Sequence, residues 1–571
     1  MNQHQRIPHR RVRLYLWIFG ALAPLALGVN TWAANDLDTP TVLSAKDNGK
    51  GGDNNGLHGA VTHNTEWLGH NDLQGRVTYQ TTVHTYPNGR VIAFAGHFAA
   101  NPPMLNPLTG NLEQNGTSLV DVTDPRKPVY LQHIPANNGG ARMNMICDGS
   151  ILPQGTAGHV YLLRENGAVS HEVWDVTDPV HSTLVSTPVQ GLDVTHRSWW
   201  DCRTGIAYIV GGATKSKTAP DGWNPKSSPN QHLKIFDLSN PASPKYIMDF
   251  GYPGQNPGST FVIPGTENTT KTVPPGVHGP IVVSTFNGNE VAGGRAINRL
   301  YMPYGVGSDG IIQIDDLTKV LPPPYGTGTY VNPAKPTDAE LLQSQIGVIY
   351  MPGVEGGHSS YPYYGIPLSQ YANFTNNTVR DILGVSSEET DNRCTGSPHL
   401  LYLLDITQTI GQGGSTSAEQ HPWPISTVTV NDFSQRPNFC SRGTRFGVHS
   451  MNENFNDPYY GKLMVSAWFD AGIRVTDIRD PYHPAEVAYF IAPVNANTQP
   501  SSATINGVKY TSKDVSCDNT YVDNDGLLYC GDRVGGGLDI VRLTGDAAQI
   551  VKVDNARNNG GDGGDGGDGG D

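Results

Sequence analysis

Short apolar strings recur along the chain, and each string ends in a turn that usually contains an Asp residue. Some strings alternate apolar and polar positions and others are apolar throughout, and β-branched and aromatic residues are frequent in both kinds. These patterns are typical of β-strands that are buried on one face or on both. An Asx-Pro step often ends the string, because proline has no N–H for a sheet and Asp stabilises turns. The pattern predicts an all-β chain.

Seven copies of this strand and turn lie in order along the sequence. They are SLVDVTDP from Ser118, HEVWDVTDP from His171, LKIFDLSNP from Leu233, IIQIDDLT from Ile311, LLYLLDIT from Leu400, IRVTDIRDP from Ile473 and LDIVRLTG from Leu538. A second short strand follows each copy, and two strand-like runs precede most of them. Four strands in each of seven units predict a seven-bladed β-propeller with four antiparallel strands per blade. We interpret the recurring acids as turn caps: Asp121, Asp175, Asp237, Asp405 and Asp477.

The strings VDVTDP, VWDVTDP, IFDLSNP and VTDIRDP resemble the LVIVD repeat of exported bacterial β-propellers. The resemblance covers nearly the whole chain after its first residues, although the fourth, fifth and seventh copies depart from the pattern. It implies the propeller fold. It implies no particular activity, because propellers serve as binding modules, scaffolds and enzymes.

The first 34 residues have the order of an export signal. Arg10, Arg11 and Arg13 precede the apolar run LYLWIFGALAPLALGV from Leu14, and small residues follow at Ala33 and Ala34. The run is short for a membrane span and contains a proline. We therefore expect a signal peptide over residues 1–34 and a periplasmic or secreted protein with no span left after cleavage. The Arg pair leaves a twin-arginine route open.

The rest of the chain divides into three predicted parts. Residues 35–66 form an N-terminal extension or a closing strand, and residues 67–556 form the propeller. The sequence leaves open whether the region 39–45 closes blade seven. The Gly/Asp repeat of residues 557–571 is predicted to be a disordered tail, since it has nothing apolar to bury. Calcium-binding β-roll repeats need an apolar residue in each turn, which this tail lacks.

Composition restricts the partners. The net charge is -14, and no basic run lies outside the first 15 residues. The chain would therefore repel a phosphate backbone, so a nucleic acid is excluded as a partner. A small molecule or a cell-surface protein or polysaccharide fits better.

Six cysteines in an exported chain predict disulfides. In a propeller, turns between the first and second strands of a blade share one face, and the loops between blades share the other. This geometry narrows the pairings to Cys147 with Cys202, Cys394 with Cys440, and Cys517 with Cys530.

Four of the 19 histidines recur at one structural position, at or just before the innermost strand of blades three to six. They are His196, His278, His358 and His449. Their side chains could converge on the axis and bind a first-row transition metal, with Cu or Fe favoured. His70 and His97 are possible further ligands, and Glu355, Glu453 and Asp193 are possible hydrogen-bond partners of the ligands. The alternative is that each His bonds a neighbouring loop.

This arrangement is similar in architecture to carotenoid-cleaving oxygenases, which hold iron with four histidines of a seven-bladed propeller. It is also similar to the selenium-binding or methanethiol oxidase family, which places histidines near the axis. These similarities are not motif matches and assign no residue here.

Two function hypotheses follow. The first is a metal-dependent oxidoreductase that binds a small substrate, with Arg442 and Arg445 as candidate anion-binding residues; inter-blade salt bridges are their alternative role. The second is a non-catalytic propeller that presents loops to a cell-surface partner. No nucleophile elbow or phosphate-binding loop supports other chemistry.

Overall fold

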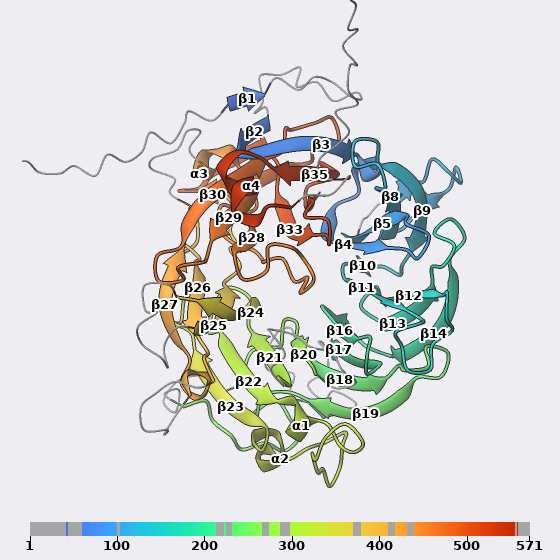
Figure 1. The fold of residues 1–571 in the computed structure, drawn as a ribbon, viewed down its shortest axis with the longest axis vertical. Coiled ribbons are helices and arrows are strands. Elements are labelled where there is room, and N and C mark those ends of the chain that lie inside the picture. Colours follow the sequence, from blue (N-terminus) through green and yellow to red (C-terminus); the bar gives the residue numbers. More distant parts are fainter. Residues whose placement is uncertain are drawn as a thin grey trace, which may run out of the picture. The chain divides into compact units, whose positions relative to one another are not determined.

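A computed structural model describes residues 41–43, 60–99, 103–212, 222–223, 231–264, 273–285, 297–368, 379–408, 417–430, 439–553 and 557. Seven small antiparallel sheets stand in a ring around an axis, as the prediction of a seven-bladed propeller requires (Figure 1). Each repeated string of the sequence forms the third strand of its blade, counted from the axis. The expectation of an all-β fold with four strands per blade is confirmed.

The blades follow the chain in order, each with its strands given from the axis outward. Blade one contains β4 (Thr78–Thr85), β5 (Val91–Phe98), β8 (Gly116–Asp121) and β9 (Val129–Pro135), and β10 (Gly140–Ala141) also pairs with β5. Blade two contains β11 (Asn144–Asp148), β12 (Val160–Asn166), β13 (Ser170–Asp175) and β14 (Thr183–Gln190). In blade three, β15 (Val194–Thr195) and β16 (Trp199–Asp201) share the inner position beside β17 (Ile206–Gly212), β18 (His232–Asp237) and β19 (Lys245–Phe250). Blade four contains β20 (Ile281–Val283), β21 (Arg299–Tyr304), β22 (Ile311–Asp316) and β23 (Gln345–Tyr350).

The last three blades complete the ring. Blade five contains β24 (Ser359–Pro367), β25 (Val379–Ser386), β26 (Leu401–Asp405) and β27 (Trp423–Val428). Blade six contains β28 (Leu463–Ala467), β29 (Ile473–Asp477) and β30 (Ala485–Ile491), and its inner position is one bridge from Met451 to Ser466. Blade seven contains β33 (Cys517–Val522), β34 (Leu528–Asp532), β35 (Leu538–Leu543) and β3 (Thr65–Asn71).

The N-terminal part of the described chain closes the ring. Strand β3 is the outermost strand of blade seven and pairs with β35, from Thr65 opposite Leu543 to Asn71 opposite Leu538. Two earlier strands, β2 (Ala60–His63) and β1 (Thr41–Leu43), extend blade six beyond β30 instead. Within the region 39–45, residues 41–43 thus contribute to blade six, and residues 65–71 join the two ends of the propeller.

The recurring acids cap the turns that end the third strands. Each accepts a hydrogen bond at its Oδ1 from the backbone N–H two residues later, at 2.8–3.0 Å. The five are Asp121, Asp175, Asp237, Asp405 and Asp477. The turn therefore has a local cause in the sequence.

Apolar side chains of neighbouring blades pack against each other. Between blades six and seven, for example, Val465, Val475, Leu528 and Val541 lie in one buried cluster. Burial of such a side chain contributes about 1.5–3 kcal/mol, so the blades stabilise one another around the ring.

The three predicted disulfides are confirmed. Cys147 and Cys202 join blades two and three, and Cys394 joins the β25–β26 loop to Cys440 in α3 (Phe439–Arg442). Cys517 and Cys530 lie on neighbouring strands but are not directly opposite each other: Cys530 faces Thr520 in the ladder.

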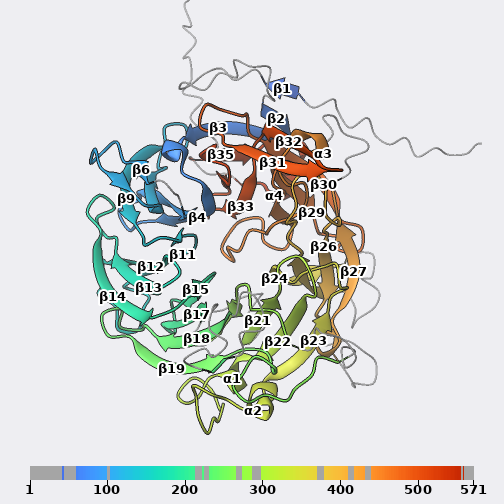
Figure 2. The ribbon, with the colours of Figure 1, turned by 180° about the vertical axis from the view of Figure 1, so that it is seen from behind.

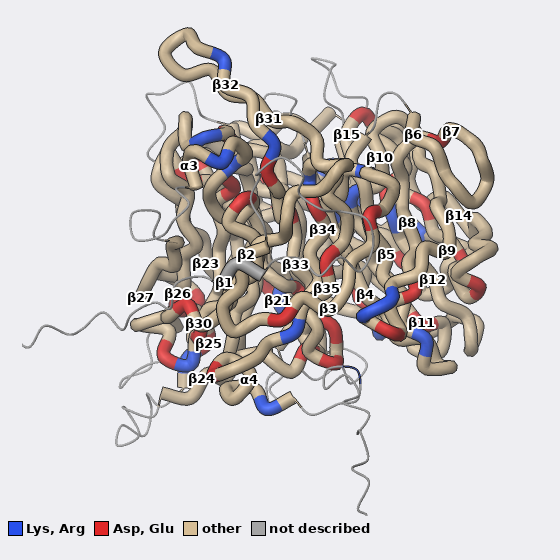
Figure 3. The backbone as a smooth tube through the Cα atoms, turned by 90° about the horizontal axis from the view of Figure 1, so that it is seen from above, with Lys and Arg blue, Asp and Glu red and all other residues tan. Residues whose placement is uncertain are grey.

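The remaining elements are short and lie outside the blades. They are the pairs β6 (Met104–Leu105) with β7 (Leu112–Glu113) and β31 (Pro500–Ile505) with β32 (Val508–Lys513), the helices α1 (Leu317–Val320), α2 (Asp338–Leu342) and α4 (Gly545–Val551), and the 3-10 helices η1 (Leu73–Gly75) and η4 (Ala418–Gln420). The reverse view repeats the ring of blades (Figure 2). Seen from the side, the β31–β32 hairpin projects from one face and α4 lies toward the other (Figure 3).

Two predictions concern residues that the structure does not describe. The signal peptide over residues 1–34 lies outside the described ranges, as does the tail apart from residue 557. Among the described residues, no helix has the length and apolar character needed to cross a membrane.

Candidate metal centre

Four histidines from four successive blades approach the axis. His196 lies between β15 and β16, and His358 directly precedes β24. His278 lies shortly before β20, and His449 lies two residues before Met451, whose bridge to Ser466 is the inner position of blade six. Because each innermost strand starts at the same face of the propeller, residues just ahead of these strands meet there. This is the face of the loops between blades.

The imidazole rings form a continuous row around the axis. The centroids of neighbouring rings are 4.1 Å apart for His196 and His278, 3.7 Å for His278 and His358, and 4.3 Å for His358 and His449. Tyr79 of β4 closes the circle, since its ring packs edge-on against both His196 and His449. The structure thus brings together the four histidines that the sequence placed at one structural position.

These histidines are neutral. All four are buried, and His358 and His449 have no exposed surface. Burial lowers the pKa of each imidazole well below 6.5, and the neighbouring histidines and arginines lower it further. A neutral imidazole has a lone pair on one ring nitrogen, which is the form that binds a metal.

Hydrogen bonds decide which nitrogen carries that lone pair. The backbone carbonyl of Asp518 accepts a hydrogen bond from His449 Nδ1, so the proton is on Nδ1 and the lone pair is on Nε2. His449 Nε2 is buried and has no hydrogen-bond partner. His196 is the opposite case, because the backbone N–H of Arg197 donates to its Nδ1 at 2.8 Å and leaves the proton on Nε2. His449 therefore presents a ligand atom toward the cluster, whereas His196 presents an N–H.

Glu388 supplies a carboxylate to the cluster. It follows β25 of blade five, and its Oε2 lies 3.4 Å from His358 Nε2 while its Oε1 lies 3.9 Å from His449 Nε2. Arg445 and Arg533 balance its charge, with guanidinium nitrogens 2.5 and 3.5 Å from Oε1. The sequence patterns did not point to this residue. Its only signal is an acidic pair, Glu388-Glu389, directly after a buried strand.

The cluster contains donor atoms suited to a metal ion. One ligand atom each from His278, His358 and Glu388 lie within 4.8 Å of one another. His278 Nδ1 and both ring nitrogens of His358 are buried without a hydrogen-bond partner. Unpaired buried polar atoms are costly, so this set fits an ion that would bind them.

The two further histidines lie elsewhere. His70 is in the outermost strand of blade seven, where its Nδ1 lies 2.9 Å from Asp539. His97 is inside blade one, where its Nε2 lies 2.8 Å from Ser118 Oγ. Neither is in the row of rings around the axis.

The two candidate arginines have different surroundings. Arg442 is buried in an ion pair with Asp514, with a shortest distance of 2.7 Å, so inter-blade pairing is the role that its contacts show. Arg445 contacts Glu388 and covers the ring of Phe469, which places it beside the histidine cluster. The acids expected near the ligands lie apart from them: Glu355 contacts His399, Glu453 pairs with Arg197, and the exposed Asp193 lies ahead of β15.

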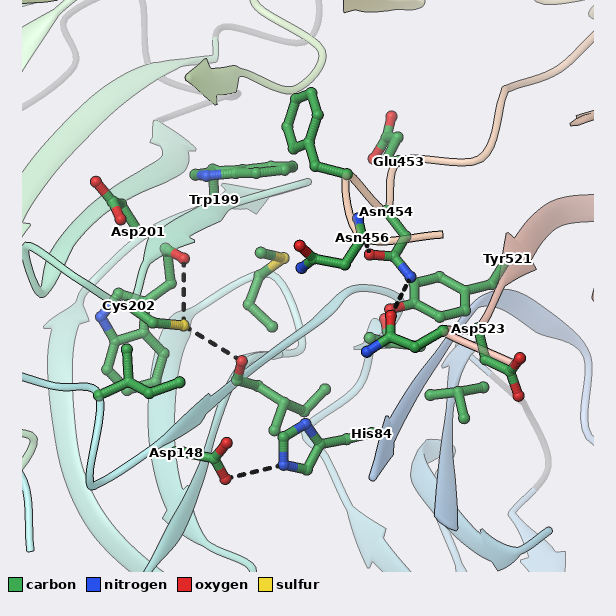
Figure 4. Close-up of a pocket in the computed structure, with 18 of the residues that line it drawn as sticks. His84, Asp148, Trp199, Asp201, Cys202, Glu453, Asn454, Asn456, Tyr521 and Asp523 are labelled. Atoms are coloured by element: carbon green, nitrogen blue, oxygen red, sulfur yellow. Dashed lines mark hydrogen bonds and ion pairs between the residues drawn. The ribbon is translucent and has the colours of Figure 1, made fainter. Parts of the chain in front are cut away.

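Two pockets lie on opposite sides of the cluster. The turn-face pocket, about 520 Å³, is enclosed by the far ends of the innermost strands and their turns, with Trp199, Asp148, Glu453 and Tyr521 among its walls (Figure 4). The loop-face pocket, about 530 Å³, is enclosed by His278, His399 and the loops of residues 305–308 and 390–397. Of the four axial histidines, His278 alone lines either of these pockets.

Comparisons with known proteins give little beyond this geometry. No protein-family model matches the chain, and no curated protein matches it either. Among solved structures, hydrazine synthase of Kuenenia stuttgartiensis is similar with a TM-score of 0.41 and 10% identity, over 83% of this chain and 97% of that one. A likeness at that level supports no conclusion about this chain.

Proposed function

We propose that this protein is an exported, metal-dependent oxidoreductase of the LVIVD-repeat propellers, with its metal held by His278, His358, His449 and Glu388. The observation that carries the proposal is a set of neutral, buried imidazoles beside one carboxylate. Several ring nitrogens of this set have no hydrogen-bond partner. Three disulfides support export to an oxidising compartment.

The donor set favours iron over copper. Two or three imidazoles with one carboxylate are typical of non-haem Fe(II) sites that keep positions open for oxygen or substrate. Such an ion supplies one-electron redox chemistry. The protein's own part is to hold the ligands: the Asp518 carbonyl fixes the His449 tautomer, and Arg445 and Arg533 hold the Glu388 carboxylate.

Metal analysis tests the proposal. Protein exported through its own signal and purified without chelators is expected to contain close to one iron per chain, or to take up one Fe(II) per chain anaerobically. His358→Ala and Glu388→Gln should each weaken metal affinity by about 10-fold to 100-fold, because each removes a ligand or its charge.

His171→Gln is the matched control. His171 is also a buried imidazole, but it is not one of the proposed ligands, and its Nε2 bonds the carbonyl of Val210, which also accepts the backbone N–H of His196. Circular dichroism should show the same fold in all variants. A wild-type protein that takes up neither Fe nor Cu would contradict the proposal and favour the non-catalytic binding hypothesis.

A further inference from the structure

A buried ion pair lies beside the candidate metal centre, toward the turn face of the propeller. The guanidinium of Arg197 pairs with the carboxylate of Glu453, and both side chains are at most 8% exposed. Arg197 directly follows His196, while Glu453 lines the turn-face pocket. This ion pair therefore lies between the histidines and the turn-face pocket.

A glycine lets the arginine take this position. A Cβ at Gly279, the residue after His278, would lie 2.5 Å from Arg197 Cβ and 2.8 Å from its Cδ. The Arg197 side chain thus runs in van der Waals contact over the backbone beside His278. Close packing of this kind obstructs the approach of a small molecule from the turn face.

The other face is open as far as His278, which lines the loop-face pocket. The wall formed by residues 390–397 is held in place by the disulfide between Cys394 and Cys440. Gly307 on the opposite wall allows close approach, because a Cβ there would lie 2.8 Å from the carbonyl oxygen of Glu388. The pocket walls therefore touch the backbone of a proposed ligand residue.

His399 brings a hydrogen-bond donor to this pocket. Its Nδ1 lies 2.8 Å from Ser387 Oγ and 3.6 Å from Glu355 Oε2, and its Nε2 makes no hydrogen bond with any described residue. Burial lowers the pKa of His399, but the nearby Glu355 carboxylate and the charges of Glu389 and Glu388 outweigh burial and raise this pKa. Because Nδ1 is bonded to Ser387, Nε2 is the ring nitrogen that remains to bond a ligand. Hydroxyls of Ser308, Thr390 and Ser397 add further polar groups.

We propose that the loop-face pocket is the substrate pocket of the metal centre and takes a small molecule with an oxygen acceptor, such as a carboxylate or carbonyl, bound by His399. This inference rests on the proposed function. It adds the route of entry, the class of substrate and a residue that binds it.

Azide binding to the Cu(II)-loaded or Fe-loaded protein tests the route, since azide is a small anion whose binding to the metal gives a charge-transfer absorption band. Ser397→Trp and Ser308→Trp place an indole on opposite walls of the loop-face pocket at exposed positions. Because the indole narrows the pocket, each variant is expected to bind azide about tenfold or more weakly. Its metal content should stay unchanged. Asn456→Trp, at an exposed position of the turn-face pocket, is the matched control and should leave azide binding unchanged.

The role of His399 has its own variant. His399→Asn should weaken azide binding severalfold without loss of metal, because the ring donor at Nε2 is removed. The inference is overturned if both loop-face Trp variants bind azide within about twofold of wild type, if Asn456→Trp weakens it, or if His399→Asn binds it as wild type does. Wild-type protein that takes up no metal overturns the proposed function itself, and this result is seen before any pocket variant is compared.

Discussion

Single residues set the chemistry of the axis. His449 and His196 are both buried imidazoles, yet one backbone contact to each gives them opposite tautomers. Tautomers of this kind decide which ring can bind an ion, since only the nitrogen without a proton has a lone pair. His278, His358 and His449 can therefore bind an ion together with Glu388. His196 instead packs against the ring of His278.

Gly279 is predicted to be essential for this arrangement. In Gly279→Ala, the new Cβ would overlap the near part of the Arg197 side chain, so the Arg197–Glu453 pair and the adjoining His278 must shift. We expect a loss of about 1–3 kcal/mol in the free energy of unfolding and weaker metal binding, measured by urea unfolding and metal titration. Gly353→Ala is the control, because its nearest atom would be 3.7 Å away. Equal stability of the two variants would contradict the contact.

Buried neutral histidines predict sensitivity to acid. Burial lowers the pKa of His171 to about 4. Above pH 6.5 the imidazole is neutral in the folded and unfolded chain, and below 6.5 the unfolded chain alone takes up the proton until the pH approaches 4. The free energy of unfolding should therefore fall as the pH falls through this window.

His171→Gln removes that contribution while its amide can still donate to the Val210 carbonyl. Between pH 7 and pH 4.5 the variant should lose about 2–3 kcal/mol less stability than wild type in urea unfolding. The same acid dependence in both proteins would show that this imidazole is protonated in the folded state.

At the scale of elements, the blades repeat one local design. The third strand, its Asp-capped turn and the fourth strand recur because the same residue pattern recurs. Two blades depart from this design at their innermost strand. In blade three this strand is split into β15 and β16, and in blade six it is a single bridge. These are the blades that carry His196 and His449.

A disulfide that closes a longer stretch of chain is expected to stabilise the propeller more than one that closes a shorter stretch. The Cys147–Cys202 bond spans 55 residues and the Cys517–Cys530 bond spans 13. Replacing the first pair by Ala should cost about 1 kcal/mol more in the free energy of unfolding than replacing the second, because a longer loop gains more entropy in the unfolded chain. Urea unfolding of the two double variants measures the difference, and the reverse order would show that strain or packing dominates.

At the scale of the whole molecule, residues 65–71 close the ring, and the first residues carry the predicted export signal. The order of basic, apolar and small residues predicts that the mature chain starts near Ala34 or Asn35. N-terminal sequencing of the exported protein should find this start, with all six cysteines oxidised under non-reducing mass analysis. Retention of residues 14–33 in the exported protein would contradict the prediction.

The sequence by itself determined the repeated units, because a strand's side-chain period and its turn caps are local properties. It also led to the disulfide pairs and to the common position of His196, His278, His358 and His449, since a known blade order relates each unit to its neighbours. These inferences need only the chain order and the geometry of one blade.

Tertiary structure alone decided what depends on distances between blades. Glu388 joins the cluster from a loop between the second and third strands, and nothing in its local sequence indicates which way that loop folds. The separation of His70 and His97 from the axis, the closing role of residues 65–71 and the Arg197–Glu453 pair have the same origin. Side chains far apart in the sequence meet only when the ring closes, because packing across blades, and not local pattern, fixes their contacts.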